Sequence, residues 1–352
     1  MNLREIGLQM MLRYRSRPGR IQRRLRRRGF RHKSRTPQVG VVRAAAVQLE
    51  FRLCETADEF ADLIYDRVRE AVGEGAELIA LPEDTATLLV GIMPGLGPLL
   101  HTLTVEQALG QIGEDVQVAD LFRILGNATR RIYETTFQTL ATGFGVHIAA
   151  GSAMLPGTDG RVLNIGHVFT PDGDVLRQAK CHLLPLEVDW GLVPGEDLAV
   201  HDTSIGMIGL PVCMDATYFE TFRILRLQGA EIVLVPIADQ EYPYNRWKAL
   251  RGVWPRVQES QVFGVQAALV GDVLGMRLTG HAGIYAPLEL TPNGDGMLAI
   301  SSAPEGETIV VADMDIAALQ HYRQEHPLEL NAALYERYIP RIYSGFWRGG
   351  AG

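Results

Sequence analysis

The segment IGMIGLPVCMDATYFE, residues 205–220, determines how the rest of the chain is interpreted. Its apolar first half predicts a buried strand, and its second half predicts a sharp turn and then a helix that continues through Phe222, Leu225 and Leu227. Cys213 therefore lies where a strand passes into a helix. Backbone N–H groups and the helix dipole favour a thiolate at such a position, so Cys213 is a candidate nucleophile.

Two further segments place polar side chains at the ends of predicted strands. LIALPE, residues 78–83, ends at Glu83, and Lys180 lies at the end of a predicted strand over residues 174–181. The carboxyl ends of buried strands are where sites of α/β proteins commonly form. Each residue alone has a plainer interpretation, as a strand-end carboxylate, a solvated lysine and an inert core cysteine.

Together, these three residue types suit the hydrolysis of an amide or a nitrile. A thiolate attacks the carbon, and a carboxylate takes the thiol proton and later protonates the leaving nitrogen. An ammonium group, with the N–H of residue 214, stabilises the oxyanion of the tetrahedral intermediate.

The remaining periodicity predicts a layered α/β sandwich rather than a strict Rossmann sheet, because βαβ units and hairpins alternate. Residues 91–120 are rich in Gly, Pro and Leu and predict an insertion, a candidate lid. Helices are expected over 56–71, 121–142, 213–228 and 247–260, and strands over 41–49, 78–81, 146–153, 162–170, 174–181, 231–235, 262–270, 282–286 and 308–314.

Composition indicates a cytoplasmic globular protein. The chain has 352 residues, 47% of them hydrophobic, with no apolar run near the roughly 18–20 residues that span a bilayer. Three cysteines, Cys54, Cys181 and Cys213, favour a reducing compartment over a disulfide framework. The histidines show no metal-ligand spacing, so we expect no metal ion.

The N-terminus is strongly basic and the rest of the chain is acidic. Residues 1–37 hold thirteen Lys or Arg and one acid, Glu5, although the whole chain has a formal charge of −7. We expect a flexible basic arm over residues 1–40, which contacts an anionic surface such as a membrane, a nucleic acid or an acidic partner. A tail without a dedicated role and a start codon assigned too early are the alternatives.

An ordered set of short motifs resembles the nitrilase superfamily, the carbon–nitrogen hydrolases, in an amidase- or carbamoylase-like branch. The motifs are RAAAVQ at 43–48, LPE at 81–83, KCHL at 180–183, PGE at 194–196, CMD at 213–215 and RVQES at 256–260. The resemblance implies an αββα sandwich over residues 41–323 that dimerises into a four-layer αββα–αββα pair. The aromatic composition of the stretch over residues 324–352 predicts a C-terminal tail at a subunit interface. The resemblance implies no metal or organic cofactor.

The resemblance also implies roles for individual residues. Glu83 becomes the general base, Lys180 the oxyanion stabiliser, Cys213 the nucleophile and Glu187 a second glutamate that positions substrate. Met214 and Thr217 are expected to contact substrate.

Two departures from the family motifs bear on the substrate. Met214-Asp215 favours amides over nitriles, and Thr217 stands where an arginine can hold a substrate carboxylate, which makes an α-carboxylate substrate less expected. The predicted reaction converts a small amide or carbamoyl amide to acid and ammonia through a cysteine thioester, in a homodimer or larger homo-oligomer. A nitrilase or an N-acyltransferase using the same thioester, and a non-catalytic scaffold with an anion-binding arm, remain alternatives.

Overall fold

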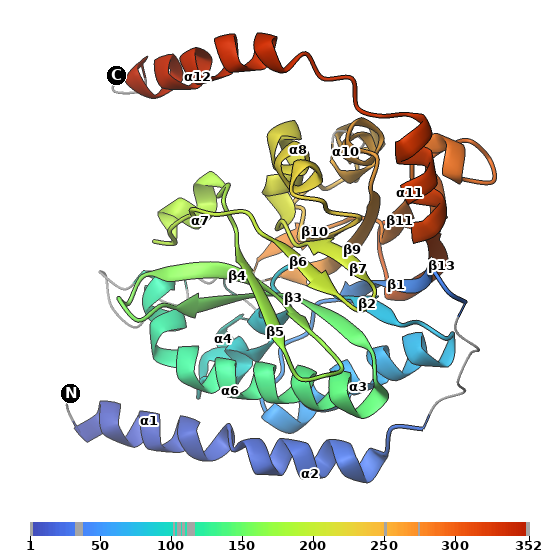
Figure 1. Cartoon of the computed structure of the whole chain (residues 1–352). Helices are drawn as coiled ribbons and strands as arrows, with labels where there is room; N and C mark the ends of the chain where they lie inside the picture. Colours follow the sequence, from blue (N-terminus) through green and yellow to red (C-terminus); the bar gives the residue numbers. More distant parts are fainter. Residues whose placement is uncertain are drawn as a thin grey trace.

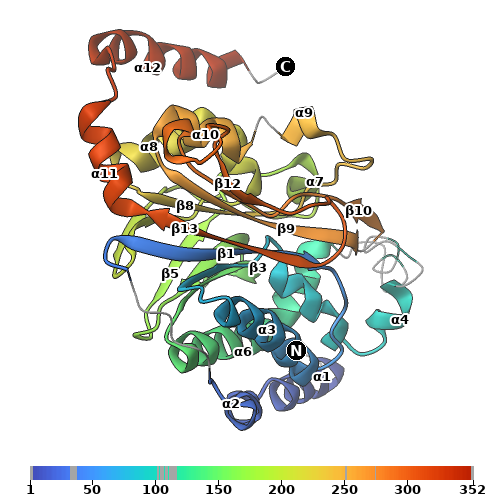
Figure 2. The same cartoon turned by 90° about the vertical axis from the view of Figure 1, so that its right-hand side faces the viewer.

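Two layers of strands lie between two layers of helices (Figures 1 and 2). The computed structural model describes residues 3–31, 38–100, 117–249, 252–273 and 275–349, with the single positions 103, 107 and 110. Helices α3 and α6 cover one side of the strands and α8 and α10 cover the other. This is the αββα sandwich that the motifs implied.

Strand β1 links the two halves of the strand order. The order β5-β4-β3-β2-β1 continues to β13, and the order β6-β7-β8-β9 continues through β11 to β12. The end of β1 pairs with β9 and joins the two halves. The strands are β1 Val41–Glu50, β2 Leu78–Ala80, β3 His147–Pro156, β4 Val162–Phe169, β5 Val175–Ala179, β6 Val200–Thr203, β7 Gly206–Gly209, β8 Ile232–Ile237, β9 Phe263–Val273, β10 Met276–Leu278, β11 Gly283–Tyr285, β12 Met297–Ile300 and β13 Thr308–Asp315.

Three apolar clusters hold the layers together. Side chains of a strand alternate between its two faces, so one strand contributes to the clusters on both sides of its sheet. In β1, Val47 and Leu49 face the cluster beneath α3 and α6, whereas Ala44 and Ala46 face the cluster between the two sheets. A third cluster lies beneath α8 and α10. The helices are α1 Leu3–Arg15, α2 Pro18–Arg28, α3 Ala57–Gly73, α4 Leu96–Leu100, α6 Val118–Phe144, α7 Pro185–Asp189, α8 Phe219–Leu227, α9 Arg246–Ala249, α10 Val253–Ser260, α11 Ile316–Glu325 and α12 Ala332–Gly349, with 3-10 turns η1 Thr85–Ile92, η2 Cys213–Thr217 and η3 Leu288–Leu290.

Local sequence signals agree with most of these elements but miss two interruptions. Thr56 caps α3 as expected, since its hydroxyl accepts from the N–H of Glu59 at 3.2 Å. The helix predicted from Cys213 onward is instead η2 followed by α8, because Tyr218 between them is extended. The helix predicted over residues 247–260 begins at Val253, with the short α9 before it. Within the predicted insertion over residues 91–120, residues 101–116 lie outside the described residues apart from three positions, whereas residues 91–100 include the end of η1 and α4.

The basic N-terminal segment is folded, in contrast to the flexible arm expected from its charge. Helices α1 and α2 lie along the α3–α6 layer (Figure 1). Leu12, Ile21 and Leu25 are buried against that layer. The net charge of the segment does not reveal this apolar face, in which Ile21 and Leu25 recur at helical spacing.

A row of ion pairs adds to that packing. Arg20, Arg24 and Arg28 recur every four residues, and they meet aspartates that recur every four residues on α3. Because residues four apart share one face of a helix, the two rows are in register along their whole length. The acidic partners are Asp58, Asp62 and Asp66.

Phe30 anchors the end of this segment and supplies a test of it. A Cβ on Gly143 of α6 would lie 2.7 Å from the Phe30 ring, whereas a Cβ on Gly73 of α3 would meet nothing within 4 Å. We expect Gly143→Ala to displace Phe30 and to speed tryptic cleavage within residues 17–31 about tenfold, as an overpacking cost of about 1–3 kcal/mol predicts. Limited proteolysis followed by mass spectrometry measures the rate.

Gly73→Ala is the matched control, because it also replaces a glycine near a helix end but meets no neighbour. It should leave the cleavage rate unchanged. Equal rates for both variants would mean that Phe30 does not hold the segment in place.

The C-terminal helix α12 extends away from the rest of the structure (Figures 1 and 2). Its Tyr343 hydroxyl donates a hydrogen bond to Glu220 of α8. The role of residues 324–352 at a subunit interface stays a prediction, as do the dimer and the domain limits. No helix among the described residues is long and apolar enough to cross a membrane.

Candidate active site

Residues expected at three strand ends converge where the two halves of the sandwich meet. Glu83 follows β2, Lys180 follows β5 and Cys213 opens η2 after β7. Glu187 comes from α7, which directly follows the Lys180 loop. The structure therefore brings together all four residues that the sequence assigned to chemistry.

The centre of the site is a lysine held between two glutamates. Lys180 Nζ donates to Glu83 Oε1 at 2.8 Å and to Glu187 Oε2 at 2.7 Å. All three side chains are buried, and the lysine side chain is only 1% exposed. Such a buried group persists only when every charge has a partner, and here one ammonium serves two carboxylates.

Asn164 of β4 completes this group and was not singled out from the sequence. Its Nδ2 donates to Glu83 Oε1 at 3.0 Å and to Glu187 Oε1 at 3.2 Å. It thereby fixes the relative position of the two carboxylates. The available signal was an amide within an otherwise apolar predicted strand, because a buried amide needs hydrogen-bond partners.

The charges of the group are strongly coupled. Burial disfavours the Lys180 charge, but Glu83, Cys213 and Glu187 outweigh it and raise the pKa of Lys180 well above its usual value. Burial raises the pKa of Glu83; Lys180 opposes this shift and Glu187 adds to it. These shifts favour the protonated form of Lys180 and make Glu83 a more basic carboxylate than usual.

The Cys213 thiol lies among charged groups that shift its pKa. Burial raises the pKa of its thiol well above the usual value, and the nearby Glu83 charge raises it further, against the opposing effect of Lys180. Both Glu83 and Lys180 lie close enough to the thiol to shift its pKa. The helix that was expected to favour a thiolate is interrupted here, because the short turn η2 precedes α8, and the thiolate stays a prediction.

The backbone at Cys213 is unusual for a side-chain-bearing residue. Its φ is 44°, in the left-handed region that non-glycine residues seldom adopt. Strain of this kind collects at functional sites, where surrounding contacts enforce it. The main enforcing contact is Asp215, which is fully buried and accepts from the Val212 N–H at 2.9 Å.

Asp215 also ties the cysteine turn to the lysine loop. Its carboxylate accepts from the backbone N–H of Cys181 at 3.1 Å and of His182 at 2.8 Å. The KCHL and CMD motifs are thus two sides of one hydrogen-bonded junction. From the sequence, Asp215 was expected only to indicate a preference for amides. Its hydrogen bonds to the backbone of the lysine loop were not anticipated.

Two glycines permit close backbone approach at the site. A Cβ on Gly151 would lie 1.7 Å from the carbonyl oxygen of Pro82, directly before Glu83. A Cβ on Gly195 would lie 2.7 Å from the carbonyl oxygen of Ala179, and the Gly195 N–H donates to the Lys180 carbonyl at 2.7 Å. The PGE motif therefore supports the lysine loop from outside.

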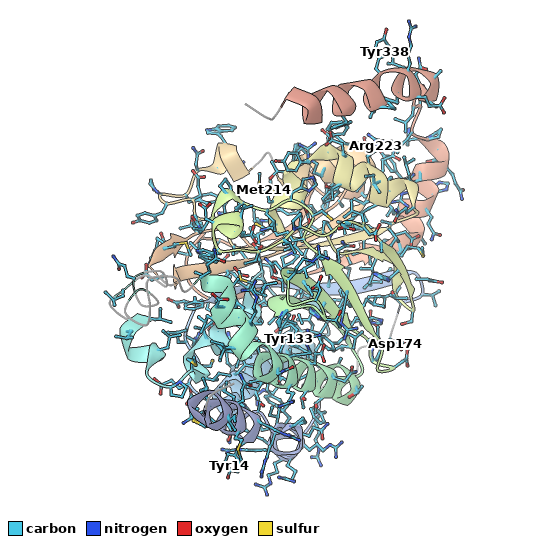
Figure 3. All side chains as sticks on the ribbon, turned by 90° about the vertical axis from the view of Figure 1, so that its left-hand side faces the viewer. Tyr14, Tyr133, Asp174, Met214, Arg223 and Tyr338 are labelled. Atoms are coloured by element: carbon cyan, nitrogen blue, oxygen red, sulfur yellow. The ribbon has the colours of Figure 1, made fainter. Side chains whose placement is uncertain are left out.

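A cavity of about 200 Å³ opens over Cys213. Met214 and Thr217 line it, as expected of substrate-contacting residues, and Met214 is labelled in Figure 3. Glu83, Lys180 and Glu187 are not among the lining residues. The other lining residues are Leu184, Ala216, Ile237, Ala238, Asp239, Tyr244, Gly252, Val253, Gln266, Thr279, Gly280 and His281.

Polar groups on the far wall of the cavity were not anticipated. Tyr244 and His281 meet edge to face, with ring centroids 4.9 Å apart. Burial lowers the pKa of His281, against the opposing effect of its hydrogen bond to the Ser301 backbone. In the described part of the chain, no group of three or more His, Cys, Asp or Glu residues could hold a metal ion.

Comparison with known proteins identifies the family. Residues 43–324 match the family described as carbon-nitrogen hydrolase. The chain belongs to the carbon-nitrogen hydrolase family. This carbon-nitrogen hydrolase thus belongs to a class of enzymes that act on C–N bonds other than peptide bonds.

Curated relatives of this carbon-nitrogen hydrolase include two amidases. It is 28% identical to a deaminated glutathione amidase of Synechocystis sp. PCC 6803, covering 81% of this chain and 95% of the relative. It is 26% identical to an omega-amidase of Danio rerio, covering 74% and 84%. A third relative, named "Probable hydrolase YhcX", from Bacillus subtilis, is 27% identical over 80% of this chain, which spans only 52% of that protein.

Solved structures with a similar fold are also amidases. The amidase from Nesterenkonia sp. AN1, solved as a double mutant in complex with acrylamide, superimposes with a TM-score of 0.60. The match covers 87% of this chain and all of the other, at 21% sequence identity. The likeness establishes that the two share a fold.

Proposed function

We propose that this carbon-nitrogen hydrolase converts a small amide or carbamoyl amide to an acid and ammonia through a thioester on Cys213. The observation that carries the proposal is the placement of Cys213, which lines a small cavity and lies within electrostatic reach of the buried Glu83–Lys180 pair. The amidase names of two relatives support the same reaction type.

In the first half of the reaction, Cys213 Sγ attacks the carbonyl carbon of the bound amide. Its proton passes to Glu83, whose raised pKa suits a general base near neutral pH. The carbonyl oxygen becomes an oxyanion, which Lys180 Nζ and the N–H of Met214 stabilise. Glu83 then returns the proton to the nitrogen, the C–N bond breaks, and ammonia leaves a thioester.

In the second half, water replaces ammonia. Glu83 takes a proton from the water as its oxygen attacks the thioester carbon, and the same two donors stabilise the new oxyanion. The C–S bond then breaks, the acid leaves, and Glu83 returns the proton to the sulfur. Glu187 acts throughout by holding Lys180 in place and sharing Asn164 with Glu83.

The cavity favours a small substrate. A volume of about 200 Å³ is below the roughly 300–1,000 Å³ of pockets for drug-sized ligands. Met214 and Thr217 lie beside Cys213 and are proposed to contact the acyl group. From the sparse use of cysteine, with Cys54, Cys181 and Cys213 all free, we infer a cytoplasmic location.

Intact-protein mass spectrometry tests the thioester. After brief exposure to a panel of small amides, carbamoyl amides and nitriles, we expect a mass gain equal to one acyl group, located on the Cys213 peptide. Ammonia release should accompany it for amides, because ammonia is the group that the thiol displaces. Addition of amine acceptors measures acyl transfer in the same samples.

Two results would contradict the proposal. One is ammonia release by protein that has been fully alkylated on Cys213. The other is an acyl adduct on Cys54 or Cys181 with none on Cys213. Amine products that outpace the acid would instead favour an N-acyltransferase that uses the same thioester.

A further inference from the structure

We propose that α1 and α2 form a docking surface for anionic lipid membranes. The surface consists of exposed side chains of these two helices, and we call it the α1–α2 face. Its members are Ile6, Met10, Arg13, Tyr14, Arg23 and Arg27.

The two helices hold this face in a fixed position. Leu12, Ile21 and Leu25 are buried on their inner side, and Gln9 donates to the carbonyl oxygen of Ile124 at 3.1 Å. Tyr65 of α3 donates to the carbonyl oxygen of Gly29 at 2.7 Å. The basic groups are therefore presented on a packed scaffold rather than on a loose tail.

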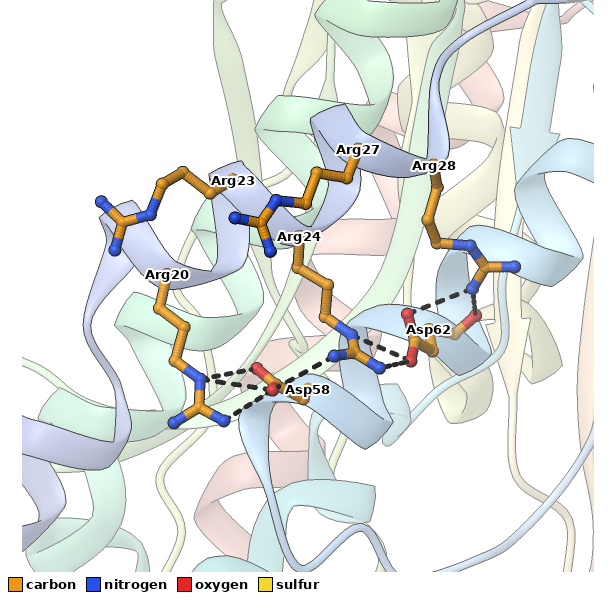
Figure 4. Close-up of a pocket in the computed structure, with 7 residues that line it drawn as sticks. All are labelled: Arg20, Arg23, Arg24, Arg27, Arg28, Asp58 and Asp62. Atoms are coloured by element: carbon orange, nitrogen blue, oxygen red, sulfur yellow. Dashed lines mark hydrogen bonds and ion pairs between the residues drawn. The ribbon is translucent and has the colours of Figure 1, made fainter.

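Only part of the α2 charge is used inside the protein. Arg20, Arg24 and Arg28 bind the aspartates of α3, as Figure 4 shows. Arg23 and Arg27 are one turn apart and are exposed, and at 3.6 residues per turn they lie opposite Ile21. Among the described residues neither forms an ion pair, so both guanidinium groups are available to an external anion.

The arginines border a hollow that suits phosphate groups. The hollow has a volume of about 680 Å³ and is lined by five arginines and two aspartates, so arginines outnumber the acids. Guanidinium groups bind phosphate oxygens through paired N–H donors. Figure 4 shows Arg23 and Arg27 beside the paired row, on the side away from Asp58 and Asp62.

Exposed apolar residues on α1 favour a membrane over a nucleic acid. Ile6, Met10 and Tyr14 are spaced four residues apart and therefore share one face of the helix; they are 38%, 68% and 59% exposed. The Arg17 guanidinium lies 4.4 Å from the centroid of the Tyr14 ring. Apolar side chains beside arginines are typical of helices that lie in the interface of a bilayer, whereas phosphate binding alone needs no such stripe.

Charge and geometry also set an orientation on the membrane. The chain as a whole carries −7 although residues 1–37 are strongly basic, so an anionic surface attracts the α1–α2 face and repels the rest. Figure 3 shows Tyr14 and Met214 on opposite sides of the strands. Docking through α1 and α2 would leave the Cys213 cavity open to solution.

Vesicle flotation with the full chain tests this inference. We expect binding to vesicles of equal parts phosphatidylglycerol and phosphatidylcholine, weakened by salt, and none to pure phosphatidylcholine. Each basic side chain at such a surface contributes about fivefold in affinity, so Arg23→Gln with Arg27→Gln should weaken binding about thirtyfold. Met10→Gln should weaken it severalfold through lost insertion of the side chain.

Arg337→Glu is the matched control. Arg337 is exposed on α12, far from α1 and α2 in Figure 1, and its reversal changes net charge as much as the double variant does. It should leave vesicle binding unchanged. Three results would each overturn the proposal. The first is no vesicle binding by the unmodified chain in the assay, and the second is a loss of binding in Arg337→Glu as large as in the Arg23→Gln, Arg27→Gln double variant. The third is tighter binding to duplex DNA than to vesicles, with the DNA binding unchanged by Met10→Gln.

Discussion

Cys213→Ala should lower kcat/KM for amide hydrolysis by a factor on the order of 10⁵–10⁶, the range seen when a catalytic nucleophile is removed. Without the sulfur no thioester forms, and the remaining groups offer only oxyanion stabilisation to a direct attack by water. Ammonia release under substrate excess measures the loss.

The fold of this variant should survive. Cysteine and alanine both carry a Cβ, so the strain of a φ of 44° is the same for either. The Asp215 contacts that hold the turn come from backbone N–H groups and are unaffected by the substitution. Thermal unfolding should therefore stay close to that of the unmodified protein.

Cys181→Ala is the matched control for the nucleophile. Burial raises the pKa of Cys181 to about 12, and its sulfur lies 3.3 Å from the carbonyl oxygen of Asp197, away from the cavity. We expect this variant to keep most of its activity. Turnover by Cys213→Ala within a hundredfold of the unmodified enzyme, or a comparable loss in Cys181→Ala, would refute the assignment of the nucleophile.

The positions of these groups were predictable because strand ends are visible in sequence. Glu83 and Cys213 each follow a short apolar run that ends at a turn, and Lys180 ends a predicted strand over residues 174–181. Sites of α/β proteins commonly form at the carboxyl ends of strands, which marks all three positions, although β2, β5 and β7 are not neighbours in the strand order. The αββα layers follow from the same alternation of strands and helices.

Contributions from strand interiors and loops were not predictable in this way. Asn164 lies inside β4, where nothing local indicates that its amide faces two glutamates rather than solvent. Gly151 is needed only because Pro82 approaches it from a different strand end. Both roles arise from pairing between segments distant in sequence, and local periodicity carries no information about such pairing.

The N-terminal helices show the same limit on a larger scale. Counting charges in residues 1–37 suggests mutual repulsion and a solvated arm. Matching the arginine spacing of α2 with the aspartate spacing of α3 would have revealed a complementary surface, because residues such as Arg24 and Asp62 repeat at the same four-residue interval. A segment is flexible only if its charges and apolar residues lack partners elsewhere in the chain.

Lys180→Met should abolish activity and destabilise the fold by about 3–5 kcal/mol at neutral pH, the usual cost of removing one partner from a buried ion pair. Methionine fills similar space but leaves Glu83 and Glu187 without the ammonium that lies 2.8 Å and 2.7 Å from them. Two buried carboxylates held by one asparagine repel each other, so the variant relieves the repulsion by taking up a proton. Chemical denaturation across a range of pH measures the deficit.

The pH dependence of that deficit has a definite sign. Burial already raises the pKa of Glu83, and loss of the opposing Lys180 charge raises it further in the folded variant. A group with a raised folded pKa stabilises the fold below its unfolded pKa of about 4.3, and that contribution is lost as pH rises through the folded value. The deficit relative to the unmodified protein should therefore be small near pH 4–5 and larger at pH 8.

Combining Lys180→Met with Glu187→Gln separates stability from chemistry. The second substitution removes one of the two negative charges and keeps an amide that can hydrogen-bond to Glu83, so we expect it to restore about half of the lost stability at neutral pH. Activity should stay absent, because no cation remains to stabilise the oxyanion. If turnover returned together with stability, Lys180 would be a structural partner of the glutamates rather than a catalytic group.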